Sequence, residues 1–197
     1  MKRILIASLL ALLPLGKTLP IGVKISGLTS TLIIITTQRA AEAESAVFYF
    51  NRAINKVKEG DEYGAISDYS KALEIDPNDT DSYYNRANSK RRLKYFPAAI
   101  LDYNKVIEIA PNHERAYTNR GISKFELGDY YGAISDYNKA IEINPKAIKA
   151  FNNRGIAKRK LGDDKGGCDD YKKAISLGNK TTEAWYKTDG AAWCRNM

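Results

Sequence analysis

The stretch AISDYNKAIEINP, residues 133–145, occurs nearly unchanged at two earlier places in this 197-residue chain. Residues 65–77 read AISDYSKALEIDP, and residues 99–111 read AILDYNKVIEIAP. Each copy starts with Ala and ends with Pro, and successive copies start 34 residues apart. A fixed period of this length is typical of repeat proteins, in which each copy packs against the same neighbours as the copy before it.

The spacing of apolar residues within one copy predicts an amphipathic helix. The apolar residues at the start of the quoted stretch fall on one helical face: Ala133, Ile134, Tyr137, Ala140 and Ile141. A second helical stretch, residues 115–127, precedes this copy and ends at Gly128, a usual helix stop. Pro145 cannot continue the second helix. Each period is therefore predicted to be a helix, a tight turn, a helix and a second turn.

The period and its residue pattern resemble the tetratricopeptide repeat (TPR) family. The aromatic position of the first helix holds Tyr49, Tyr83, Tyr117 and Phe151. The Ala-x3-aromatic pair of the second helix is Ala65/Tyr69, Ala99/Tyr103, Ala133/Tyr137 and Gly167/Tyr171. The resemblance implies an all-α fold, a right-handed α-solenoid of antiparallel helix pairs (a TPR superhelix).

The same resemblance assigns four repeats and a C-terminal capping helix. The repeats are residues 46–79, 80–113, 114–147 and 148–181, and the capping helix starts at about residue 182. The fourth repeat departs from the pattern, because Asn179 replaces the proline and Gly167 replaces the packing alanine. We expect looser geometry in that repeat.

Residues 1–43 have the character of a targeting segment. A charged start, MKR, precedes the short apolar run ILIASLLALL, as in a secretory signal, and the run is too short to span a bilayer easily. A second apolar stretch, residues 28–37, is followed by an A-x-A site at residues 41–43, which predicts cleavage after Ala43. Val23 is an alternative start. We expect export, to the periplasm or another extracytoplasmic compartment; the alternative is an uncleaved N-terminal membrane anchor.

The composition gives little support to catalysis. The chain carries a formal charge of +8, a single histidine, and no recognisable catalytic or nucleotide-binding motif. We expect no enzyme activity, no cofactor and no metal site. About half of the net charge lies before residue 44, so the remainder is only mildly basic. Nucleic acid is therefore not an expected partner, although a nucleic-acid-binding helical repeat protein is kept as the alternative of a different class.

Charged residues recur at three fixed positions of the repeat. An arginine and, four residues later, a lysine occupy the first helix of each repeat, and such a pair repels on one helical face. An aspartate in the second helix faces back toward them. We predict structural ion pairs between Arg52 and Asp68, Arg86 and Asp102, Arg120 and Asp136, and Arg154 and Asp170. The alternative is a ligand site built from these residues.

In TPR proteins the inner face of the first helices forms a concave groove that binds a peptide or helix. Carried over by position, the resemblance places Asn51, Asn85, Asn88, Asn119, Asn153, Lys149, Arg91 and Arg159 along this groove. Amide side chains suit an extended backbone, and the cations favour an acidic segment or a free carboxylate. Alternatively, the asparagines form a hydrogen-bond ladder between helices.

Some TPR domains clamp the C-terminal carboxylate of a chaperone with lysine and asparagine side chains. Asn88, Asn119 and Lys149 fit that pattern, but Phe50 stands where the first clamp lysine is expected, with Tyr84 at the same position of the next repeat. The clamp is therefore incomplete.

The family's architecture also bears on the two cysteines. Cys168 starts the second helix of repeat four, and Cys194 is expected about three turns into the capping helix beyond Trp185. Because the next helix of a TPR stack packs on the preceding hairpin, we predict a disulfide between them, which suits an exported protein. Two reduced cysteines are the alternative. The expected function is a scaffold or adaptor for an unidentified, acidic protein or peptide partner, with a role in assembling a membrane or envelope complex.

Overall fold

The computed structural model describes residues 45–188 and 191–196, so the targeting segment predicted at residues 1–43 lies outside the described residues. Throughout the described part the chain folds into α-helices joined by short turns, and no strand occurs there. None of the helices in these ranges is both long and apolar enough to cross a membrane. The predicted all-α fold class is confirmed.

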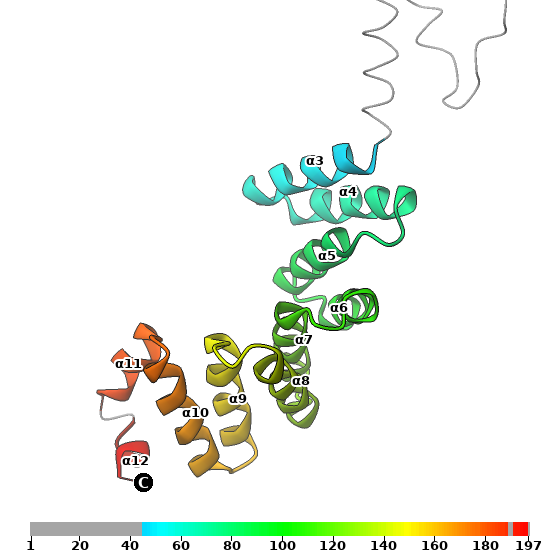
Figure 1. The fold of residues 1–197 in the computed structure, drawn as a ribbon. Coiled ribbons are helices and arrows are strands. Elements are labelled where there is room, and N and C mark those ends of the chain that lie inside the picture. Colours follow the sequence, from blue (N-terminus) through cyan, green and yellow to red (C-terminus); the bar gives the residue numbers. More distant parts are fainter. Residues whose placement is uncertain (1–44, 189–190, 197) are drawn as a thin grey trace, which may run out of the picture. The chain divides into compact units, whose positions relative to one another are not determined.

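The helices form successive pairs along the chain (Figure 1). Their bounds are α3 Ala46–Lys58 and α4 Glu62–Ile75, α5 Thr80–Arg92 and α6 Phe96–Ile109, α7 Glu114–Glu126 and α8 Tyr130–Ile143, α9 Ile148–Lys160 and α10 Asp164–Ser176, then α11 Lys180–Tyr186 and α12 Ala192–Arg195. The two helices of each pair pack on each other, and the second also packs on the first helix of the next pair. This consecutive packing makes the stack an α-solenoid.

The interior of the stack consists of small residues around one aromatic ring per repeat. Tyr69, Tyr103 and Tyr137 are almost fully inaccessible to solvent, and Tyr171 is also buried. The alanines that the resemblance placed beside them, Ala65, Ala99 and Ala133, are fully buried. Because alanine leaves little space between helices, the aromatic ring fills the gap, and this arrangement repeats from pair to pair.

The turn inside each helix pair requires a left-handed residue. Gly60, Gly128 and Gly162 have φ values of +83°, +83° and +84°. Only glycine adopts such a conformation without a steric cost. The second repeat has Lys94 at this position, with φ of +62°, the sole non-glycine residue with positive φ among the described residues.

The C-terminal cap differs from the sequence prediction. Helix α11 starts at Lys180 rather than at about residue 182, because the side chain of Asn179 accepts a hydrogen bond from the backbone N–H of Thr182 and caps the helix there. It ends at Tyr186, and Cys194 belongs to the separate short helix α12. The prediction that Cys194 lies within the capping helix is therefore wrong, although Cys168 and Cys194 do form a disulfide, with 5.4 Å between their Cα atoms.

Candidate functional site

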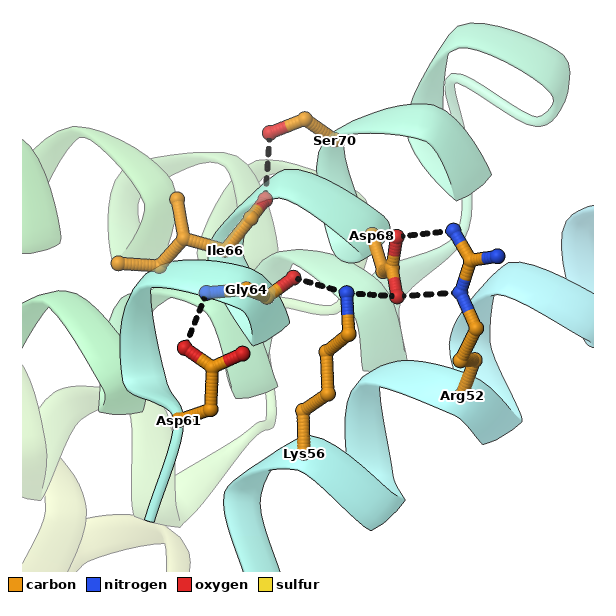
Figure 2. Close-up of polar contacts among 7 residues, drawn as sticks. All are labelled: Arg52, Lys56, Asp61, Gly64, Ile66, Asp68 and Ser70. Carbon is orange, nitrogen blue, oxygen red and sulfur yellow. Dashed lines mark hydrogen bonds and ion pairs between the residues drawn. The ribbon is translucent and has the colours of Figure 1, made fainter. Parts of the chain in front are cut away.

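An aspartate shared by two cations joins the helices of the first pair (Figure 2). Arg52 donates from Nη2 to Asp68 Oδ1 at 2.6 Å, and Lys56 Nζ lies 2.9 Å from Asp68 Oδ2. Lys56 Nζ also donates to the Gly64 carbonyl oxygen, at 3.4 Å. The hydrogen bond from Arg52 lowers the pKa of Asp68, against the opposing effect of burial. The repulsion between the two cations is thereby offset.

The same arrangement occurs in the other three repeats. The Arg Nη2–Asp Oδ1 distances are 2.8 Å for Arg86–Asp102, 2.6 Å for Arg120–Asp136 and 2.6 Å for Arg154–Asp170. The lysines Lys90, Lys124 and Lys158 lie 2.7, 2.9 and 2.9 Å from the other carboxylate oxygen. The structure thus brings together all four of the pairs that the sequence suggested.

Three of the arginines also reach the preceding repeat. Nη1 of Arg120 donates to Asn104 Oδ1 at 2.7 Å, and Nη1 of Arg154 donates to Asn138 Oδ1 at 2.7 Å. Arg86 makes the corresponding contact with Ser70 Oγ, at 3.0 Å. Each guanidinium further lies over the aromatic ring three residues earlier, as with Arg120 over Tyr117. Since these contacts occupy the guanidinium group on several sides, we interpret the arginines as structural rather than ligand-binding residues.

The asparagines form one local cluster rather than a ladder along the stack. Asn119 Nδ2 donates to Asn88 Oδ1 at 2.9 Å and to the Tyr84 hydroxyl at 3.1 Å. Tyr103 donates to the same Asn88 oxygen at 2.8 Å. Asn85 instead donates to the carbonyl oxygen of Asp81 on its own helix. The remaining two predicted asparagines do not join this cluster: Asn51 is exposed and Asn153 is partly buried.

His113 has a role that the sequence reading missed. Its Nδ1 accepts a hydrogen bond from the backbone N–H of Ala116, so the imidazole caps helix α7. The ring also lies 4.8 Å, between centroids, from that of Tyr84. Its position directly before a helical stretch, where serine, threonine or aspartate is usual, was the available signal.

A pocket of about 710 Å³ lies between α9, α10 and α11. We call it the repeat-four pocket. Its lining comprises Ile148, Lys149, Asn152, Ile156, Arg159, Tyr171, Gly178, Asn179, Lys180, Thr181, Thr182 and Trp185. Two of the predicted groove residues, Lys149 and Arg159, meet here. Arg91 holds the repeat position of Arg159 but lies two repeats away, and its Nε is buried without a hydrogen-bond partner among the described residues.

The walls of the repeat-four pocket combine cations with apolar surface. Lys149, Arg159 and Lys180 line it, and no carboxylate occurs among its lining residues. The rings of Tyr171 and Trp185 pack edge to face with centroids 5.1 Å apart. Across the pocket, the Thr182 hydroxyl donates to Asn152 Oδ1 at 2.6 Å and ties the cap to α9. Such a site suits a ligand that has both an anionic group and an apolar part.

Family models described as tetratricopeptide repeat match residues 46–79, 80–113 and 114–147. These three ranges of 34 residues cover 102 of the 197 residues. No curated protein matches the sequence significantly.

Solved structures have the same fold. A crystal structure of MamA is 22% identical, with a TM-score of 0.68 over 75% of this chain and 86% of that chain. MamA from Desulfovibrio magneticus RS-1 is 21% identical, with a TM-score of 0.65 over 73% and 78%. The first TPR domain of RPAP3, bound to the HSP90 peptide SRMEEVD, is 28% identical, with a TM-score of 0.58 over 59% of this chain and 93% of that one.

Proposed function

Because the chain belongs to the tetratricopeptide repeat family, we propose that it is a protein–protein interaction scaffold whose repeat-four pocket holds an acidic segment of a partner protein. The observation that carries this proposal is the pocket lining, which presents three cations and no carboxylate; outside the lining, Lys180 is paired with Glu183 and Arg159 with Asp164. Cations that converge on a concave surface attract a carboxylate and disfavour a basic ligand.

The apolar part of the pocket provides the remaining contact. Ile156 and the rings of Tyr171 and Trp185 can receive an aliphatic or aromatic side chain beside the acidic group. The RPAP3 domain in its complex binds a peptide with the acidic sequence SRMEEVD. That relative supports a peptide as the ligand class.

The ligand is not expected to be clamped as in chaperone-binding TPR domains. Phe50 and Tyr84 occupy the positions at which a clamp lysine is expected. The side chains of Asn88 and Asn119 are hydrogen-bonded to each other, which reduces their capacity for a ligand carboxylate. The acidic segment is therefore proposed to bind at the repeat-four pocket, where Lys149 is exposed.

We further propose that the scaffold acts outside the cytoplasm, in the assembly of a membrane or envelope complex. The signal-like segment at residues 1–43 and the Cys168–Cys194 disulfide support this, because disulfides persist in oxidising compartments. A membrane-anchored form of the same scaffold is the second candidate. Cell fractionation with mass determination of the mature N-terminus distinguishes them: export predicts a start at Glu44 in the soluble extracytoplasmic fraction, whereas an uncleaved chain in the membrane fraction supports the anchor.

Selection of random peptides displayed on phage tests the acidic-ligand proposal. The full chain should enrich peptides that combine Asp or Glu with a neighbouring apolar residue. The Lys149→Glu/Arg159→Glu double variant should not enrich them, because its pocket walls repel carboxylates. The matched control is Lys165→Glu/Lys172→Glu, which makes the same charge change at exposed positions of α10 outside the pocket. Enrichment of the same peptides by the pocket variant would contradict the proposal.

A further inference from the structure

The side chain of Arg159 passes close to the backbone of α10 at Gly167, where any larger residue would collide with it. Where the first three repeats have alanine, repeat four has Gly167. A Cβ atom built at Gly167 would lie 2.6 Å from Arg159 Cγ and 2.9 Å from the backbone oxygen of Gly155. Both distances are too short for real contacts. Gly167 is thus explained by the close passage of the arginine side chain and of helix α9.

The guanidinium group of Arg159 rests on an aromatic ring of the C-terminal segment. Its Cζ lies 4.3 Å from the centroid of the Trp193 ring, closer than in the other arginine–aromatic contacts of the described residues, which measure 5.1 to 5.4 Å. Trp193 in turn lies 6.4 Å, between ring centroids, from Trp185 of the pocket wall. This contact differs from those of Arg52, Arg86, Arg120 and Arg154, because Arg159 is not bound to a buried aspartate.

The charge of Arg159 is only weakly compensated. Among the described residues, the ion-pair partner of Arg159 is Asp164, whose Oδ1 lies 3.5 Å from Arg159 Nε, and both side chains are exposed. An exposed ion pair at such a distance contributes little and is readily exchanged for a better partner. The guanidinium is therefore held by Trp193 together with the Tyr171 side chain, while its positive charge remains available to a ligand in the pocket.

The disulfide joins the two segments that contact the Arg159 side chain. Cys168 directly follows Gly167 on α10, and Cys194 directly follows Trp193 on α12. Helix α12 has only four residues and cannot be stable on its own. The covalent bond therefore keeps Trp193 beside Arg159. Each cysteine is adjacent in sequence to a residue that Arg159 contacts, namely Gly167 and Trp193.

We infer that Trp193, held by the Cys168–Cys194 disulfide, positions Arg159 to receive a carboxylate of the partner, so that the C-terminal segment determines the affinity of the repeat-four pocket for acidic ligands. This inference rests on the proposed function. A guanidinium that is fixed before binding loses less side-chain entropy when it forms two parallel hydrogen bonds with a carboxylate. Trp193, Cys168 and Cys194 are positioning residues, because they act on the ligand only through the orientation of Arg159.

Calorimetric titration of the full chain with the peptide SRMEEVD measures how the affinity for an acidic ligand depends on these residues. Arg159→Gln should raise Kd about tenfold, since it removes a charge-assisted hydrogen bond. Trp193→Leu and the Cys168→Ser/Cys194→Ser double variant should each raise Kd by about threefold to tenfold, and Trp193→Phe, which keeps a ring beneath the guanidinium, should restore most of the affinity. Lys165→Gln, the matched loss of one charge outside the pocket, should leave Kd unchanged.

Nuclear magnetic resonance of the unliganded chain measures the positioning directly. The Arg159 Nε–H signal should be shifted by the ring current of Trp193, should lose this shift in Trp193→Leu, and should lose much of it in the double cysteine variant. If the shift persists without the disulfide, or if Trp193→Leu binds the peptide as tightly as the wild type, the positioning role is wrong while the pocket proposal stands. If the wild-type chain does not bind the peptide, the carboxylate ligand and the proposed function of the pocket are both wrong.

Discussion

At the scale of single residues, each repeated arginine is stabilised by a buried aspartate. Asp136 is 3% exposed and accepts hydrogen bonds from Arg120, at 2.9 Å to Oδ2 and 2.6 Å to Oδ1. Lys124 lies 2.9 Å from Oδ2 as well. These hydrogen bonds and ion pairs offset the cost of removing the carboxylate from water. Removal of the aspartate alone leaves two like charges four residues apart on one helix, without their common partner.

We predict that Asp136→Ala lowers the free energy of unfolding by about 1–3 kcal/mol, because Arg120 and Lys124 lose the carboxylate between them. Replacing Arg120 by Leu, the residue usual in the family, in the same chain should restore most of the loss. Urea unfolding of the single and double variants measures both effects. Asp169→Ala, an exposed aspartate on α10, is the control for helix propensity. A double variant no more stable than Asp136→Ala would show that the cations do not depend on this partner.

At the scale of helices and turns, the sequence predicted the helices that recur in every repeat, but it did not predict the features that occur only in repeat four and the cap. The apolar spacing and Gly128 place α7 and α8 correctly, because the apolar spacing recurs in the repeats and three of the four have glycine in this turn. The start of α11 at Lys180 depends on the side-chain cap of Asn179. The 34-residue period alone would place this start at about residue 182. The meaning of Gly167 depends on Arg159, a tertiary contact that periodicity cannot reveal. Of the residues that line the repeat-four pocket, the sequence indicated only Lys149 and Arg159, as members of a groove along the stack, because the other wall of the pocket comes from the cap.

The backbone of the turn between α5 and α6 is strained at Lys94. Lys94 has φ of +62°, where the other three repeats have glycine. We predict that Lys94→Gly raises the free energy of unfolding by about 0.5–1 kcal/mol, because the steric cost of the left-handed conformation exceeds the added entropy of glycine in the unfolded chain. The reciprocal variant Gly128→Lys should lower it by about 1 kcal/mol. Thermal and urea unfolding of both variants checks the sign, and an unchanged or lower stability of Lys94→Gly would contradict this account.

At the scale of the whole stack, stability depends on the contacts between successive repeats. In a linear array each repeat touches only its neighbours, so cooperativity comes from the interfaces between repeats. The apolar core crosses these interfaces, as where Ala116 of α7 packs with Val106 of α6. Alongside it, Arg120 and Arg154 each reach back to an asparagine of the preceding repeat. The arginine thus links three helices, namely its own, its hairpin partner and the last helix of the preceding repeat.

We predict that the Asn104→Ala/Asn138→Ala double variant unfolds less cooperatively than the wild type. Each substitution removes one 2.7 Å hydrogen bond to an arginine of the next repeat but leaves that arginine's bond to its own aspartate intact. The loss should be about 0.5–1.5 kcal/mol per site, partly masked by the better helix propensity of alanine. Asn55→Ala, at an exposed helical position, measures that propensity gain alone. In urea the double variant should show a smaller m-value or two resolved transitions, since repeats that are coupled less tightly unfold in separate steps. A single transition with the wild-type m-value, and no loss beyond the Asn55→Ala reference, would mean that the apolar contacts alone couple the repeats.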